Sequence, residues 1–169
     1  MPDLGFLSRV RLLEGLGRED LKGFAQLIRT REFSAGQVIV REGEKGDSLF
    51  IIREGEVGVS LAITLPVSGK EREKVLVSLH PGEIFGEMAF ILGQEQRSAT
   101  AQARTEVVLY EVKSSDFEDF VERNPRAGLY IFRNIAKIIA DRLRKANQDI
   151  AKLTTVLSVV LGQWQGSEL

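Results

Sequence analysis

The stretch that decides the fold is FGEMAFILGQEQRSATA, residues 85–101. It is mostly apolar and punctuated by glycine, as a buried segment is, yet it carries Glu87 near one end and Arg97 ten residues later. The part GEMAFIL has the composition of a short helix entered from a glycine. A carboxylate and a guanidinium are costly to bury unless each meets a polar group, so this stretch predicts a ligand site within the core.

The residue types around Arg97 indicate the chemistry of that ligand. A guanidinium is planar, permanently charged and presents a fork of donors that suits a phosphate. Ser98 adds a hydroxyl beside it, and Ala99 is small enough to let a ligand approach. Glu87 needs a hydroxyl or another polar group to face. Together these residues fit a phosphorylated sugar, with its phosphate near Arg97 and a sugar hydroxyl near Glu87.

The sequence around this stretch predicts a mostly β fold with flanking helices. Between residues 32 and 113, short runs rich in β-branched residues, such as QVIVRE, SLFIIREG and EVVLYEVK, are separated by turn signals. Many short strands at regular spacing are typical of a jelly-roll β-barrel. Residues 1–30 and the segment from Ser114 onward show helical spacing. We therefore expect N-terminal helices, a jelly roll and a long C-terminal helix.

The C-terminal helix is predicted to run from Pro125 to Leu161 and to carry a coiled-coil seam. A helix of that length is about 55 Å long, whereas a domain of this size is about 30–35 Å across. The near half of the seam has its own domain to pack on, but the far half needs another surface. We expect a parallel homodimer through this helix, with residues 1–124 as one unit and 125–169 as the dimerisation and lid helix. The seam residues follow one another at steps of three and four: Leu129, Phe132, Ala136, Ile139, Leu143, Ala146, Ile150, Leu153, Leu157 and Val160.

The composition argues against several other classes of protein. The 169 residues suffice for about one domain, and the net charge of −1 argues against a nucleic-acid-binding surface. The chain contains no cysteine and a single histidine, so we expect no metal site and no nucleophilic catalytic set, and hence no enzyme. We find no apolar run long enough for a signal peptide or membrane span, and expect a cytoplasmic protein without a membrane partner.

The 85–101 stretch resembles the phosphate-binding cassette of cyclic-nucleotide-binding domains, whose pattern is F-G-E-[LM]-A followed by R-[AST]-A-[ST]. The resemblance extends from about Leu13 to Leu153. It includes FSAGQVIVREGEKGDSLFIIREGEVGV, which resembles the family's opening strands, and the lead-in LHPGEIFGE. A motif of this length in this context is specific. The resemblance implies the family's β-roll and a regulatory or sensor role, in which ligand binding signals through movement of the C-terminal helix.

The resemblance also implies roles for individual residues. Glu87 would accept a hydrogen bond from the ribose 2′-hydroxyl, and Arg97, assisted by Ser98, would pair with the cyclic phosphate. The last helix would close over the base, with Asn147 able to donate to and accept from a purine edge and Arg142 able to meet Glu87. The implied ligand contacts are Phe85, Gly86, Glu87, Met88, Ala89, Arg97, Ser98 and Ala99, and the implied base or lid contacts are Arg142, Ala146 and Asn147.

Two departures from the eukaryotic pattern, Gln96 before the arginine and Ser98 after it, resemble the bacterial cAMP-receptor branch. We therefore expect cAMP as the ligand, with cGMP as the alternative because a hydroxyl beside the arginine also occurs in cGMP-selective members. The bacterial branch continues into a helix-turn-helix domain, which we do not expect in this chain. Two alternatives stay open: a partial cAMP-receptor-type transcription regulator, and a structural dimer that binds no nucleotide.

Overall fold

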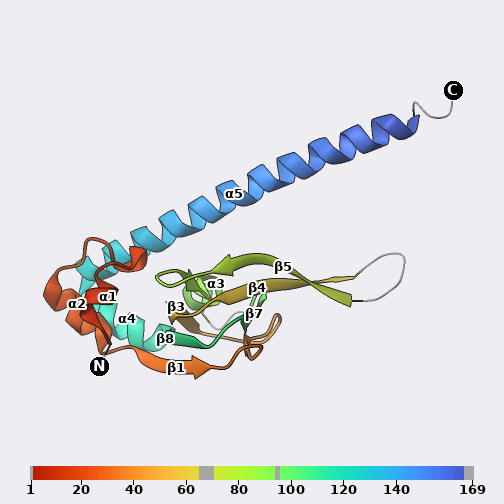
Figure 1. The fold of residues 1–169 in the computed structure, drawn as a ribbon. Coiled ribbons are helices and arrows are strands. Elements are labelled where there is room, and N and C mark those ends of the chain that lie inside the picture. Colours follow the sequence, from red (N-terminus) through yellow and green to blue (C-terminus); the bar gives the residue numbers. More distant parts are fainter. Residues whose placement is uncertain (1, 65–70, 94–95, 166–169) are drawn as a thin grey trace.

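A computed structural model describes residues 2–64, 71–93 and 96–165. Helices lie at both ends of the chain and a β-roll lies between them (Figure 1). This arrangement confirms the predicted fold class, including the long C-terminal helix. The helical elements are α1 (Leu4–Leu7), the 3-10 helix η1 (Arg11–Leu13), α2 (Arg18–Ala25), α3 (Glu87–Leu92), α4 (Ser114–Arg123) and α5 (Pro125–Gln165).

The described residues form eight strands in two antiparallel sheets, as a jelly roll requires. The first sheet has the order β1-β8-β3-β6 and the second the order β2-β7-β4-β5. Strands distant in sequence are therefore neighbours in both sheets, and this brings the 85–101 segment beside β3 and β4. The strands are β1 (Arg29–Phe33), β2 (Val38–Val40), β3 (Ser48–Glu54), β4 (Val57–Thr64), β5 (Glu71–Leu79), β6 (Ile84–Phe85), β7 (Thr100–Ala103) and β8 (Val107–Lys113).

Strand β3 divides the core into two clusters. Because side chains alternate along a strand, Phe50 and Ile52 point between the two sheets, whereas Leu49 and Ile51 point to the outer face of the first sheet. The inner cluster fills the roll. The outer cluster joins that face to the N-terminal helices, α4 and the first half of α5. The helices thus form a layer on the first sheet, and α5 starts from a fixed base.

Asn134 anchors α5 to the N-terminal segment. Its side chain is buried, and its Nδ2 donates to the carbonyl oxygens of Leu12 at 3.0 Å and Glu14 at 2.8 Å. Arg11 on η1 also pairs with Asp141, about two turns further along α5. These contacts hold residues 11–14 against α5. The N-terminal segment and the first half of α5 therefore pack as one unit.

Most of the surface by which α5 packs on the domain lies beside the apolar seam rather than on it. The buried face consists of Ala127, Ile131, Asn134, Ile135 and Ile138. Seam residues remain exposed even in the near half, where Leu129 is 67% exposed and Phe132 44%. Our expectation that the near half of the seam packs on its own domain is therefore wrong for Leu129. It holds in part for Phe132, whose ring packs edge-on against Phe117 with a centroid distance of 5.4 Å, and for Ile139, which packs against the outer cluster.

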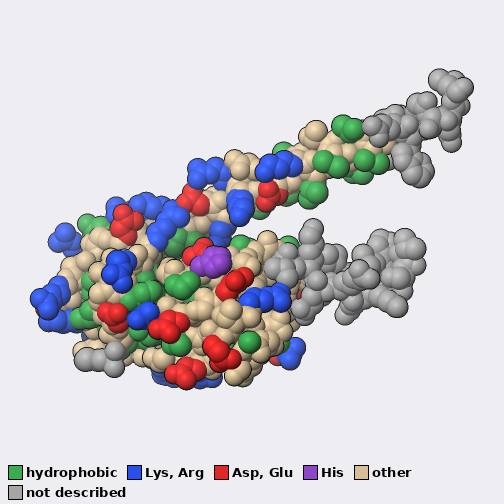
Figure 2. Space-filling model, in the orientation of Figure 1, with side chains coloured by type: hydrophobic (Ala, Val, Ile, Leu, Met, Phe, Trp, Pro, Cys, Tyr) green, Lys and Arg blue, Asp and Glu red, His purple; other side chains and the backbone are tan. Residues whose placement is uncertain are grey.

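The far half of α5 extends past the β-roll (Figure 1). Its seam side chains Leu143, Ile150, Leu153 and Leu157 are about as exposed as Leu129, at 58–63%. Exposed apolar side chains continue along this part of the helix in the space-filling view (Figure 2). A contiguous apolar surface of this kind marks an interaction site. Within the described residues, no helix is both long and apolar enough to cross a membrane.

Candidate ligand-binding site

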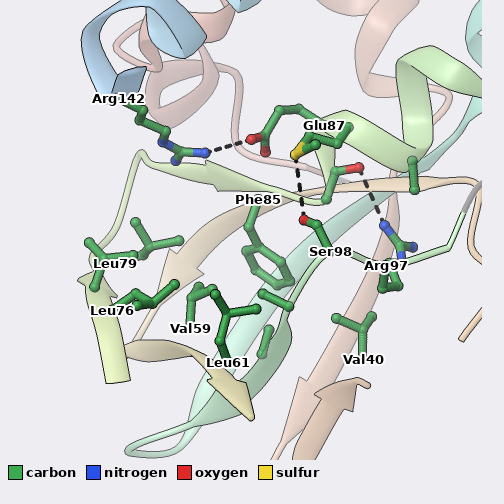
Figure 3. Close-up of a pocket in the computed structure, with 16 residues that line it drawn as sticks. Val40, Val59, Leu61, Leu76, Leu79, Phe85, Glu87, Arg97, Ser98 and Arg142 are labelled. Carbon is green, nitrogen blue, oxygen red and sulfur yellow. Dashed lines mark hydrogen bonds and ion pairs between the residues drawn. The ribbon is translucent and has the colours of Figure 1, made fainter. Parts of the chain in front are cut away.

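A cavity of about 370 Å³ lies between α3, the β4–β5 hairpin and α5 (Figure 3). It brings together side chains that are up to 102 positions apart in the sequence, from Val40 to Arg142. Nine of the eleven predicted site residues line it: Phe85, Gly86, Glu87, Met88, Ala89, Arg97, Ser98, Ala99 and Arg142. The cavity therefore forms around the 85–101 stretch.

Two glycines make the space that Arg97 occupies. Gly86 has φ of +81°, which favours glycine, and a Cβ there would lie 2.7 Å from both the Arg97 Nη1 and the Ser48 carbonyl oxygen. A Cβ at Gly46 would overlap the Arg97 guanidinium directly. The guanidinium is thus held between two stretches of bare backbone. The sequence predicted a role for Gly86 but gave no signal for Gly46 beyond its place in a turn.

Arg97 is buried, and backbone carbonyls and an aromatic ring hold it. Its Nη1 donates to the Ser48 carbonyl oxygen at 2.9 Å, and its Cζ lies 5.6 Å from the centre of the Phe50 ring. The same Nη1 donates to the Gly86 carbonyl oxygen at 3.3 Å (Figure 3). Burial lowers the pKa of the guanidinium, and the nearby carboxylates of Asp47 and Glu111 counteract part of that effect. The group still carries its charge at neutral pH, since an arginine does not deprotonate in proteins.

Glu87 at the first position of α3 faces a different cation. Its Oε1 accepts a hydrogen bond from Arg142 Nη1 at 2.9 Å, and Arg142 Nη2 donates to the Ile84 carbonyl oxygen at 2.5 Å. The Glu87 side chain is 11% exposed, whereas that of Arg142 is 36% exposed. The expectation that Arg142 meets Glu87 is confirmed. Glu87 and Arg97 therefore have separate partners, and α5 is joined to the cavity by an ion pair.

A polar group of residues behind Arg97 was not predicted. Ser48 Oγ donates to Glu111 Oε1 at 2.8 Å, and Lys113 Nζ lies 3.1 Å from Asp47 Oδ1. The carboxylates place negative charge behind the guanidinium and fix the β3 end that supplies the Ser48 carbonyl. In the sequence, Glu44-Lys45-Gly46-Asp47 has the composition of a turn and lies within the segment that resembles the family's opening strands, but neither observation tells what the turn packs against.

An apolar wall completes the cavity. Val59 and Leu61 come from β4, and Leu76, Val77 and Leu79 come from the paired strand β5 (Figure 3). Val59 lies opposite Val77, and the register shifts immediately after this pair. Sequence reasoning did not find this wall, because a one-residue change in register moves a side chain to the other face of a strand. The wall offers a planar apolar group a surface beside the polar end of the cavity.

Ala146 and Asn147 do not line the cavity. Both are exposed on α5, and Asn147 borders a shallow depression on the helix surface together with Leu143 and Arg144. Ser98, by contrast, points into the cavity, where its Oγ lies 3.4 Å from Met88 Sδ (Figure 3). The described part of the chain contains no group of His, Asp and Glu side chains that is arranged to hold a metal ion.

The cavity thus has a buried cation at one end, a buried carboxylate nearby and an apolar wall opposite them. Residues 30–124 match the model of the cyclic nucleotide-binding domain. The chain belongs to this family. The matched range includes both sheets and all cavity residues except Arg142, which α5 supplies from outside it.

Relatives of this cyclic nucleotide-binding domain include modules of larger proteins. It is 36% identical over 149 residues to glutaminase 1 of Bradyrhizobium diazoefficiens; the match covers 88% of this chain and 22% of the glutaminase. The catabolite activator protein of Thermus thermophilus is 29% identical, with a TM-score of 0.70 over 85% of this chain and 63% of that one. The regulatory domain of Toxoplasma gondii PKA, solved with cAMP, is 28% identical, with a TM-score of 0.58 over 69% and 42%.

Proposed function

We propose that this domain is a sensor that binds a cyclic nucleotide, preferentially cAMP, in the cavity around Arg97 and Glu87. The observation that carries the proposal is that these two side chains line one cavity and have separate partners, so both ends of a sugar phosphate can be met at once. The cAMP in the Toxoplasma regulatory domain supports the choice of ligand by similarity. Metal-dependent or nucleophilic catalysis has no part in this function, and we place the protein in the cytoplasm.

In the proposed complex each polar end of the nucleotide meets a side chain of matching chemistry. Arg97 and Ser98 bind the cyclic phosphate, and Glu87 accepts the ribose 2′-hydroxyl. A carboxylate accepts about four hydrogen bonds, so Glu87 keeps capacity for the ribose while paired with Arg142. The base lies on the wall that Leu61 and Leu76 help to form. Backbone groups of Gly86, Met88 and Ala89 surround the sugar, next to Phe85 and Ala99.

Calorimetry with cAMP and cGMP tests the assignment. Arg97→Ala removes the charge that faces the phosphate, and we expect affinity to fall by at least about tenfold, since a charge-assisted hydrogen bond contributes roughly 1.5–3 kcal/mol. Arg104→Ala, an arginine outside the cavity, serves as the control and should bind as wild type does. Binding of either nucleotide to the Arg97→Ala protein with unchanged affinity would show that the site is assigned wrongly.

We further propose that two copies associate in parallel through the α5 seam and that 125–169 acts as the dimerisation and lid helix of the 1–124 unit. The exposed seam supports this, because its apolar side chains have no other described surface to pack on. Replacing Leu143 and Leu153 together by Lys should leave a monomer in light scattering. Thr155→Lys, on the opposite face, should remain dimeric. A wild-type monomer at micromolar concentration would contradict the proposal.

The heptad positions give Asn147 a role in that dimer. With Leu129 and Phe132 at positions a and d, Arg142 falls at position g and Asn147 at position e, and these two positions face each other across a parallel interface. Asn147 would therefore approach Arg142 of the other subunit, next to that subunit's cavity, and contact the base there. Ala146, at position d, packs in the seam. Asn147→Ala should weaken nucleotide binding in the dimer and leave it unchanged in the Leu143→Lys, Leu153→Lys monomer.

The alternative is a structural dimer whose cavity binds no nucleotide. The Glu87–Arg142 ion pair is an observation in favour of the structural dimer, because this contact gives the carboxylate a partner without a ligand. Thermal unfolding with saturating cAMP or cGMP separates the two cases. A rise in the midpoint supports the sensor, and no shift with either nucleotide supports the structural dimer. The similarity to the Thermus catabolite activator protein also keeps a role as part of a transcription regulator open to test.

A further inference from the structure

The first half of α5 is strongly basic, although the chain as a whole is not. Residues 125–148 contain six Lys and Arg against one Asp, a net charge of +5, whereas the full chain has a net charge of −1. The rest of the chain is therefore acidic. Lys and Arg side chains gather over the N-terminal helices and the first half of α5 in the space-filling view (Figure 2). Because of this separation of charge, the first half of α5 attracts anionic groups whereas the rest of the chain repels them.

Four of these cations lie on one face of the helix. They are separated by seven, four and seven residues, steps close to whole turns, so they form a line about 27 Å long. All four are exposed. We call this line the basic stripe. It consists of Arg126, Arg133, Lys137 and Arg144.

The basic stripe is largely unpaired within the described residues. Arg126 and Lys137 make no ion pair with any residue in the described ranges, and Arg133 stacks on the Tyr130 ring with its Cζ 4.8 Å from the ring centre. Arg144 alone has a carboxylate partner, Asp141, at 2.5 Å. In the proposed parallel dimer, position e at Arg133 faces position g at Gly128, which carries no charge. Dimerisation through the seam therefore leaves the stripe available.

We propose that the basic stripe docks an acidic surface of a protein partner, the unit that this sensor regulates. Two observations favour a protein over a phosphate polymer or a membrane. The stripe has three arginines for one lysine and an adjoining tyrosine, a composition typical of protein interfaces. Asp141 beside the stripe repels a uniformly anionic surface, whereas discrete carboxylates can avoid it.

The inference rests on the proposed function in one respect only, namely that the docked partner is the protein that the sensor regulates. The stripe lies on the helix whose Arg142 contacts the cavity, so a partner held there would sense a movement of α5. Docking itself is measured without nucleotide. A protein that binds no cyclic nucleotide but docks acidic peptide would overturn the proposed function and leave this inference standing.

The test measures binding of labelled poly-L-glutamate to the full chain by fluorescence anisotropy at low and physiological salt. The stripe variant Arg126→Glu, Lys137→Glu should bind at least about tenfold more weakly than wild type, since close charge pairs of this kind couple strongly. The control Arg18→Glu, Arg41→Glu changes the net charge equally at exposed sites outside the stripe and should lose less than about twofold. Both variants should keep the wild-type melting temperature and nucleotide affinity.

Two results would overturn the proposal. Equal losses in the stripe and control variants would mean that poly-L-glutamate senses only the net charge. Tighter binding of random duplex DNA, or of phosphatidylcholine vesicles containing phosphatidylserine, at the same concentration of negative charge would assign the stripe to a nucleic acid or a membrane. A preference for the polypeptide that is lost only in the stripe variant supports the proposal.

Discussion

Arg142 on α5 and Glu87 at the start of α3 lie 55 positions apart and join the C-terminal helix to the cavity through a 2.9 Å ion pair. The same guanidinium also donates to the Ile84 carbonyl on β6. A single side chain therefore links α5 both to a carboxylate of the cavity and to β6. Any ligand group that competes for Glu87 changes what holds the helix in place.

The ion pair should couple measurably in a double-mutant cycle. Glu87→Gln, Arg142→Gln and the double variant, compared by urea unfolding at neutral pH, should give a coupling free energy of about 1 kcal/mol. We expect no more than this because Arg142 is 36% exposed and solvent screens the pair. Arg144→Gln, on the same helix but exposed, should change stability by less than about 0.5 kcal/mol. A coupling of zero would mean that α5 is not held at the cavity by this contact.

Gly46→Ala should weaken nucleotide binding more than it destabilises the fold. A Cβ at this position overlaps the Arg97 guanidinium and moves it out of place, while the Gly46 backbone lies outside the left-handed region. We expect an affinity loss of about tenfold by calorimetry, because misplacing a charge-assisted contact costs on the order of 1.4 kcal/mol.

Gly17→Ala is the matched control for that experiment. A Cβ there meets Asp20 at an ordinary 3.5 Å, so binding should be unchanged. Equal affinities of the Gly46→Ala and wild-type proteins would contradict the placement of Arg97.

Asn134→Ala should be strongly destabilising. It leaves two carbonyl oxygens, that of buried Leu12 and the partly buried one of Glu14, without the donor they have now. The expected cost is about 1–3 kcal/mol in the free energy of unfolding, measured by urea titration. Asn147→Ala removes the same side chain from an exposed site on the same helix and should cost less than about 0.5 kcal/mol. Similar costs at both sites would disprove the anchoring role of Asn134.

The contact between Arg11 and Asp141 should depend on pH. The hydrogen bond from Arg11, with a further contribution from the charges of Arg11 and Arg144, lowers the pKa of the Asp141 carboxyl. A carboxyl with a lowered folded-state pKa stabilises the fold at a pH above its unfolded value of about 3.9, and this effect is lost as the pH falls through the folded value.

The difference in urea midpoint between wild type and Arg11→Ala should therefore be present at about pH 7 and shrink at about pH 3. A difference that stays constant over this range would mean that Arg11 acts through packing rather than through its charge. Arg9→Ala, an exposed arginine in the turn before η1, provides the control.

The local parts of the fold and site followed from the sequence. Gly86, Glu87, Arg97 and Ser98 lie within thirteen positions, so their relation depends on one turn and one short helix. The helix start at Pro125 was also correct, because proline at the first helical position is a local signal. The predicted start of the helix after β8 was less accurate, because a capping pattern of two residues is a weak signal. The spacing of Ser115 and Glu118 predicts a capping box at the start of this helix, but α4 begins at Ser114 after Lys113 without a side-chain cap.

The parts that depend on long-range pairing did not follow from the sequence. The apolar wall of Val59 and Leu61 requires the β4–β5 register and its shift after Val59, which no local pattern determines. The full burial of Ile131 and the partial exposure of Phe132 depend on how α5 is rotated over η1. Several stripes of α5 are apolar, and only the three-dimensional packing decides which one is buried.

The length of α5 has a mechanical consequence. From Arg142 to Gln165 the helix runs 23 residues, roughly 35 Å, past the last point at which it touches the cavity. In the proposed signalling, α5 would tilt about the 2.9 Å contact between Arg142 and Glu87. A tilt of about 10° at this contact displaces the far end by about 6 Å, one full helical turn of 5.4 Å. A tilt of α5 that leaves the β-roll unchanged would therefore be enough, in the proposed dimer, to shift the far end of one α5 helix past the other by about one helical turn.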